Sequence, residues 1–224
     1  MKTLLKNLTL LPLVLLLLIS IEPGVLPQEE EEEGSSVIKF VGADKCKICH
    51  NKAESGAQYT VWTKATHSQA FALLGSEEAK KVAKGLGIVD PQKSGKCLKC
   101  HSTAYFFTEE KVSNIAVKKD GSPRLTVEQG VSCESCHWAG SAYQKKKTME
   151  IFDEAVKAGL NPHPEQNCLK CHNKDNPTWN PSRYTLKDGT KSGFDYDQAF
   201  EKIKHPNPLK AAERAKRKAE SKKL

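Results

Sequence analysis

The 224-residue sequence is poor in the residues that build a large protein core. Aromatic residues make up 7% and hydrophobic residues 38%, which is lean for a chain of this length. Apart from a possible pair of strands near the N-terminus, no run of alternating polar and apolar residues predicts a β-sheet. We therefore expect short helices and much irregular backbone, and the interior needs another source of apolar mass.

No cysteine lies outside one repeated pattern, which excludes a separate disulfide or a catalytic thiol. The pattern is Cys-x-x-Cys-His, and its four copies use all eight cysteines. These are Cys46, Cys49, Cys97, Cys100, Cys133, Cys136, Cys168 and Cys171. The histidines that follow them are His50, His101, His137 and His172.

Three kinds of chemistry use this cysteine spacing. Zinc often pairs two C-x-x-C units and would give two sites, and a redox disulfide needs one unit. Neither explains a histidine directly after every second cysteine. Covalent c-type haem does, because each thiol bonds one vinyl group and the imidazole binds the iron as proximal ligand. The sequence thus predicts four c-type haems, in a mainly α multihaem cytochrome c fold organised around them.

The formal charge of +8 does not predict a nucleic-acid partner. Residues 206–224 hold seven Lys or Arg against two Glu, so much of the excess is local. Each haem brings two propionates against one net positive charge on ferric iron, and four haems remove roughly four charges when oxidised. No recognised motif accompanies the basic tail.

Residues 1–27 are typical of a secretory signal peptide or an N-terminal anchor. Lys2 and Lys6 precede an apolar run, Leu8 to Ile21, that is short for a spanning helix. No clear A-x-A cleavage site follows, so a cleaved signal and a membrane tether both stay open, and no lipoprotein cysteine is present. Either predicts a periplasmic or other extracytoplasmic location, where c-type attachment takes place in bacteria.

Composition divides the rest of the chain into three parts. The acidic residues of 28–40 predict an extended linker, because a block of like charges repels itself. The tetrahaem domain is expected over 41–207. The tail, 208–224, is basic and almost wholly polar, which predicts a solvated helix or disorder.

Four helices are expected within the domain. Apolar residues at helical spacing predict one over 53–75. A second has Ser76 as N-cap and Gly85 as its stop, and a third spans Met149 to Lys157. The fourth begins at Asp195, with Gln198 completing a capping box.

Four irons exceed the histidines left to fill their distal faces. His67, His163 and His205 remain, so not every iron has two histidine ligands. His67, inside the first expected helix, and His205, at the end of the last, are predicted distal ligands. His163 is a candidate that could instead bond a propionate, and Met149 one that could instead be a core residue.

Three segments of the chain resemble the tetrahaem cytochrome c-554 family: GVSCESCHWAGSAY, KATHSQAFALL and FDYDQAFEKIKHPNP. The similarity covers most of 41–207. It implies stacked haem pairs, first with third and second with fourth, with three six-coordinate irons and a five-coordinate second iron. The best-known member carries electrons from hydroxylamine oxidation in ammonia-oxidising bacteria.

The resemblance also carries over to single residues. It implies that His67 and His205 are distal ligands and that His163 is not. The family's third distal histidine follows the third motif, where this chain has none, and Met149 is the nearest substitute. Trp138-Ala139 replaces the usual Gly-Pro after that motif.

Closely spaced haems in one small domain predict an electron relay rather than an enzyme, because no acid–base group is evident near an open iron. We expect an exported cytochrome that passes electrons between a redox protein donor and an acceptor. Two alternatives remain. An open iron could act on nitric oxide, nitrite or hydroxylamine, or the chains could self-associate into a conductive filament.

Overall fold

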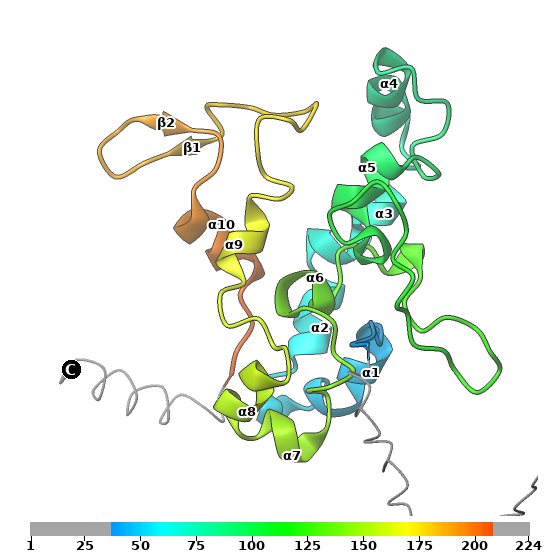
Figure 1. Ribbon diagram of the computed structural model, residues 1–224. Helices are drawn as coiled ribbons and strands as arrows, with labels where there is room; N and C mark the ends of the chain where they lie inside the picture. Colours follow the sequence, from blue (N-terminus) through cyan, green and yellow to red (C-terminus); the bar gives the residue numbers. More distant parts are fainter. Residues whose placement is uncertain (1–36, 208–224) are drawn as a thin grey trace, which may run out of the picture. The chain divides into compact units, whose positions relative to one another are not determined.

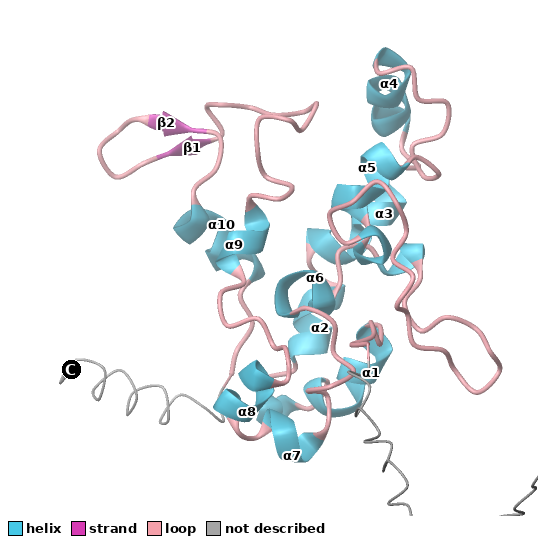
Figure 2. Ribbon diagram, viewed as in Figure 1, coloured by secondary structure: helices cyan, strands magenta, loops and turns pink. Residues whose placement is uncertain are grey.

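The computed structural model describes residues 37–207 (Figure 1). The chain divides into two units, Met1–Ser36 and Val37–Leu224. The predicted signal or anchor, nearly all of the acidic linker and the basic tail lie outside the described residues. Within 37–207 the protein is mainly helical with long irregular connections, as the sequence predicts (Figure 2). No helix in this range is long and apolar enough to cross a membrane.

The helices are short and are separated by turns and loops. In chain order, with η marking 3-10 helices, they are α1 (Ala43–His50), η1 (Ala53–Ser55), α2 (Gln58–Thr63), η2 (Thr66–Gln69), α3 (Ala70–Leu73), α4 (Glu77–Gly85), α5 (Gly95–His101), η3 (Thr103–Tyr105), η4 (Val127–Gln129), α6 (Cys133–His137), α7 (Lys146–Met149), α8 (Phe152–Lys157), α9 (Glu165–Cys168) and α10 (Tyr196–Ile203).

Two predicted helix starts are confirmed by their caps. The Ser76 hydroxyl accepts a hydrogen bond from the Ala79 N–H at the start of α4, and the Asp195 carboxylate accepts one from the Gln198 N–H at the start of α10. Each side chain thus pairs an amide that has no partner within its helix. The reciprocal half of the box is wrong, because the Gln198 side-chain amide donates to the Thr185 carbonyl instead.

The single helix predicted over 53–75 is wrong. The segment forms η1, α2, η2 and α3, with a break at Ala65, whose backbone is extended. Tertiary bonds hold this break. The Trp62 indole donates to the Val131 carbonyl at 2.9 Å, and the Val131 N–H donates to the His67 carbonyl at 2.9 Å. A neighbouring loop therefore takes hydrogen bonds that a continuous helix would have made.

The helix predicted from Met149 to Lys157 is also divided. Extended backbone at Ile151 separates α7 from α8, and α8 ends near Gly159, which has φ +101°. The predicted helix therefore ends where expected, but its predicted first residue, Met149, belongs to the separate helix α7.

A small sheet is present where the sequence was not expected to form one. Strands β1 (Tyr184–Thr185) and β2 (Lys191–Ser192) pair antiparallel, with Tyr184 opposite Ser192. The turn contains Asp188 and Gly189, and the Asp188 carboxylate accepts the Thr190 N–H at 2.9 Å. An Asp-Gly pair is a strong hairpin signal, so the local sequence did contain the information.

The apolar core is small. Its buried members are Phe40, Ala104 and Leu125, with partly buried aromatic and aliphatic side chains packed against them. Phe40, which the sequence assigned to the linker, is 4% exposed, and its backbone bridges to Ile115. The most buried side chains also include a carboxylic acid, Glu134, at 1% exposure. The lean core expected from composition is confirmed within 37–207.

Candidate haem-binding site

Each Cys-x-x-Cys-His motif adopts helical backbone. The first ends α1, the second ends α5 and the third forms α6. Residues i, i+3 and i+4 share one face of a helix, so the two thiols and the imidazole of a motif lie on the same side. The fourth motif begins at the end of α9, where the His172 N–H donates to the Cys168 carbonyl at 2.8 Å and continues the helical turn.

All eight cysteines are free thiols in the structure. In residues 37–207, no group of three or more His, Cys, Asp or Glu side chains is arranged to hold a metal ion by itself. The donors of each motif are therefore two thiols and one imidazole on one helical face. This donor set matches a porphyrin bonded through two thioethers with an axial histidine.

The fourth motif faces a second histidine. The rings of His67 and His172 have centroids 6.1 Å apart and planes inclined by 45°. With a metal–nitrogen bond of about 2 Å and roughly 1.1 Å from nitrogen to ring centre, two imidazoles on opposite sides of one metal lie about 6 Å apart, centre to centre. The spacing therefore fits one iron between these two rings.

The hairpin supports the His172 ring. Phe194 stacks on it at 5.3 Å with planes inclined by 16°, and Tyr184 of β1 meets Phe194 edge-on. The short sheet thus packs behind the aromatic side chain that holds this imidazole.

The third motif faces a histidine in the same way. His137, the last residue of α6, and His205, just beyond α10, have ring centroids 6.1 Å apart with planes inclined by 41°. The same argument places one iron between them. The His137 carbonyl accepts the Tyr143 hydroxyl at 3.0 Å and the Asn161 N–H at 3.2 Å, which holds the end of α6 in place.

The histidines of the first and second motifs have different neighbours. His50 Nδ1 lies 3.3 Å from the side-chain oxygen of Gln58, and His101 Nδ1 lies 2.8 Å from the Ala70 carbonyl. A ligating histidine commonly donates one ring N–H to such an acceptor, which leaves the other nitrogen for the metal. Both rings are therefore oriented as proximal ligands would be.

The thiols of different motifs also meet. Cys46 of the first motif interacts with Cys133 of the third, and Cys100 of the second interacts with Cys171 of the fourth. Burial is the main cause of the raised pKa of the Cys136 thiol. The neighbouring Cys168 thiol raises that pKa further. The motifs are therefore neighbours in the spatial order first, third, fourth, second.

A buried carboxylate links the first motif to the third. Glu134, between the two cysteines of α6, accepts backbone N–H groups from Val41 and Gly42 at 2.9 Å and from Gly140 at 2.8 Å. Burial raises the pKa of Glu134, and these three N–H donors oppose the rise. Val41 and Gly42 lead directly into α1, so one side chain fixes the start of the first motif against the third.

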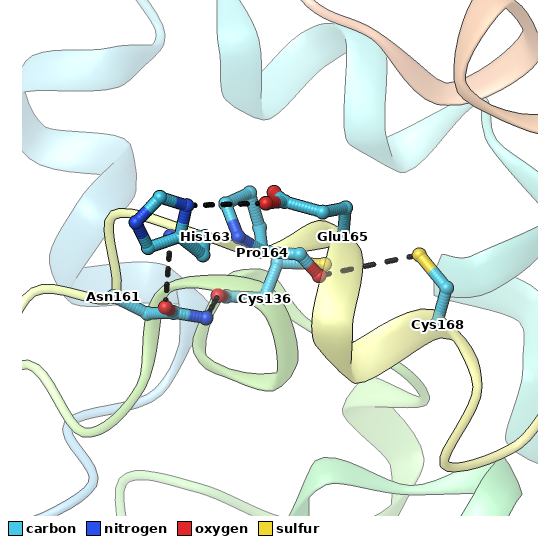
Figure 3. A network of polar contacts seen from close by, with 6 residues as sticks. All are labelled: Cys136, Asn161, His163, Pro164, Glu165 and Cys168. Atoms are coloured by element: carbon cyan, nitrogen blue, oxygen red, sulfur yellow. Dashed lines mark hydrogen bonds and ion pairs between the residues drawn. The ribbon is translucent and has the colours of Figure 1, made fainter. Parts of the chain in front are cut away.

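Two asparagines link the third motif to the fourth. The Asn161 side chain donates to the Cys136 carbonyl at 3.0 Å, and Asn167 donates to the Ser135 carbonyl at 2.8 Å. The Asn161 side-chain oxygen also accepts the His163 N–H, as Figure 3 shows. Since Asn167 belongs to α9, these bonds join α6 directly to the helix that leads into Cys168.

The remaining ligand candidates are His163 and Met149. His163 Nδ1 lies 3.1 Å from a Glu165 carboxylate oxygen, and its side chain is 64% exposed (Figure 3). Met149 is half-buried as the last residue of α7. Neither observation tests whether His163 or Met149 binds iron, so both stay predictions.

Burial favours the neutral form of three of the paired imidazoles, those of His137, His67 and His172. It lowers the pKa of His137 to about 4, with His205 and His50 contributing further, and it lowers the pKa of His67 and His172 as well. Only a neutral imidazole has a lone pair to give to a metal. The environment of these rings therefore favours the form that can ligate.

Motifs that place two thiols and an imidazole on one helical face, together with two pairs of facing imidazoles, fit the covalent attachment of c-type haem. Residues 45–138 match the model of the family described as cytochrome c554 and c-prime. The match supports a c554-type cytochrome family for this chain and confirms the resemblance seen in the sequence. It contains the first three motifs and ends before the fourth. The family implies c-type haem and electron transfer, and its members are typically extracytoplasmic. No curated protein and no solved structure gives a significant match.

Sequence reasoning missed the residues that position the ligands. Glu134 and Asn161 look like ordinary polar residues, and their burial depends on chain segments distant in sequence. Gly130 was missed too, although a glycine before a cysteine motif is a usable signal. A Cβ there would lie 2.8 Å from the carbonyls of both His67 and Ser68. Only glycine allows this loop to approach the turn that holds His67.

Proposed function

We propose that the chain is an exported tetrahaem c-type cytochrome that relays electrons between a redox protein donor and acceptor. The observation that carries this proposal is the pair of facing imidazoles at the third and fourth motifs, at the same 6.1 Å separation. When bound, haem supplies reversible one-electron chemistry at iron. The protein's part is to attach the haems, hold their ligands and order them in space.

The proposed ligands follow from these positions. The eight motif cysteines attach the haems, and His50, His101, His137 and His172 bind the irons as proximal ligands. His205 faces the third motif and His67 the fourth, so each is proposed as distal ligand there. Two fixed imidazoles keep an iron six-coordinate in both oxidation states, because neither ligand leaves on reduction.

The spatial order of the motifs supports a relay. Neighbouring thiols place the first motif beside the third, the third beside the fourth and the fourth beside the second. Electrons tunnel efficiently only across short gaps, and this order gives a continuous path. We assign the tetrahaem domain to residues 41–207, preceded by a signal or anchor at 1–27 and an acidic linker at 28–40, and followed by a basic tail at 208–224.

Haem content and redox titration test the proposal. Pyridine haemochrome analysis and the mass of the purified chain should give four covalent haems, and potentiometry should show several one-electron steps. Fewer than four haems, or no reversible reduction, would contradict it.

A second candidate function is chemistry on nitric oxide, nitrite or hydroxylamine at an open iron. The observation that favours it is that, within residues 37–207, His50 and His101 have no facing histidine ring of the kind that His137 and His172 have. Electron paramagnetic resonance separates the two functions. A high-spin ferric signal and a nitric oxide adduct would favour the enzyme, and the absence of both would favour a pure relay.

A further inference from the structure

All seven histidines of the sequence lie among the described residues, so the distal ligands can be assigned by position. Two of the three spare histidines are taken by the third and fourth motifs, through the ring pairs His137–His205 and His67–His172. These motifs are the inner members of the spatial order, since each has a motif on both sides.

The last spare histidine does not face the first or second motif. His163 lies in the loop before α9, where it pairs with Glu165 and its N–H is held by Asn161 (Figure 3). Its ring makes no contact with another histidine ring within 37–207. The Pro162 and Pro164 that flank it restrict the backbone, so the loop has little freedom to bring the imidazole elsewhere.

We propose that the iron at the first motif, like the iron at the second, has no histidine on its distal side. In this relay each of the two inner irons would have two histidine ligands. Each of the two end irons would have one, and its sixth position would be left to a sulfur ligand or a small exogenous molecule. This inference rests on the proposed tetrahaem function, and it goes beyond the family resemblance, which leaves a single iron five-coordinate. The iron that lacks the family's third distal histidine is, on this inference, the one at the first motif, which lies at the opposite end of the relay from the second.

The positions of His67 and His205 in the chain explain why the third and fourth motifs are the ones with facing histidines. His205 follows α10, and His67 lies in the turn fixed by Val131 and Gly130. These positions bring the His205 ring opposite His137 and the His67 ring opposite His172. The first motif is instead reached by Gln58, whose side-chain oxygen lies 3.3 Å from His50 Nδ1 and acts on its proximal side.

The test is a count of irons with two histidine ligands in the full-length holo-protein. Near-infrared magnetic circular dichroism on the ferric protein should show this ligation at two of the four haems. A count of three or four would overturn the inference. Haem content, measured separately, tests the proposed function, so the two can fail independently.

Three variants sharpen this count. H67A and H205A should each lower it by one, while the matched variant H163A should leave it at two. A fall with H163A would show that this histidine closes an end iron, and it would overturn the inference even if the wild-type count were ambiguous. His163 is exposed, so its replacement should leave the fold intact.

Discussion

The third and fourth motifs differ from the first and second in what surrounds their imidazoles. His137 and His172 each face a second histidine ring, and the side chains of Glu134 and Asn167 tie α6 to both of its neighbouring motifs. His50 and His101 contact an amide oxygen and a backbone carbonyl. Contacts from distant segments hold both regions, and the difference is that the imidazoles of the inner motifs each pair with a second histidine ring.

This difference suggests a division of labour. In the proposed relay, an iron held by two fixed imidazoles would reorganise little on reduction, which suits transfer within the molecule. The outer motifs, whose imidazoles pair with no histidine ring in residues 37–207, are the ends of the proposed relay and suit exchange with partners. The predictions below test whether the inner region carries the structure, in descending order of expected effect.

Removal of the Glu134 carboxylate should be the most damaging single change. Glu134→Ala leaves three buried N–H groups without an acceptor, and each such group costs about 1–3 kcal/mol. Chemical denaturation should show a loss of at least about 3 kcal/mol. The control is Glu109→Ala, which removes a half-exposed ion pair with Lys99 that contributes little. Equal losses for the two variants would show that the inner junction is not special.

Gly130→Ala should displace the turn that holds His67. The new Cβ would lie 2.8 Å from two carbonyl oxygens at a residue with φ +61°. We expect a loss of about 2–4 kcal/mol from the close contacts and backbone strain together, and a lower bis-histidine signal in the holo-protein. Gly121→Ala is matched in backbone, with φ +80°, but meets no atom within 4 Å. An unchanged bis-histidine signal in G130A would show that Gly130 does not position His67.

Trp138→Gly should stabilise the protein. Trp138 ends the third motif at φ +66° and ψ 176°, a region that nearly excludes side chains other than glycine. Relief of this strain gives about 1–3 kcal/mol, reduced by lost packing of an indole that is 46% exposed. Trp138→Ala removes the same indole but keeps the strain, so its melting temperature should lie below that of W138G. The reverse order would contradict the strain argument.

Mild acid should change the inner irons least. Burial lowers the pKa of His137 from 6.5 to about 4, so the ring stays neutral below pH 6.5 and becomes protonated only as the pH falls through about 4. Bound iron competes with the proton and lowers that pH further. The bis-histidine spectrum should therefore remain constant as pH falls below 6.5. A change of spin state close to 6.5 would mean that the rings are open to solvent.

The sequence predicted the parts of this molecule that depend on local chemistry. Spacing alone singled out the four Cys-x-x-Cys-His motifs, whose role in haem attachment stays a prediction, and the side chains of Ser76 and Asp195 marked the helix starts that they cap. His67 and His205 were named from the ligand count, but their partners were not. The break before His67 and the burial of Glu134 arise from segments far apart in the chain, and no local pattern encodes them.

The place of His205 in the chain has a consequence for how the protein is made. A polypeptide that crosses a membrane from its N-terminus presents all four attachment motifs before this residue emerges. His67, by contrast, is already outside when His172 appears. In the exported cytochrome proposed above, the third motif would therefore gain its distal histidine only after this late segment has crossed, and a chain truncated just before His205 would lack that ligand alone.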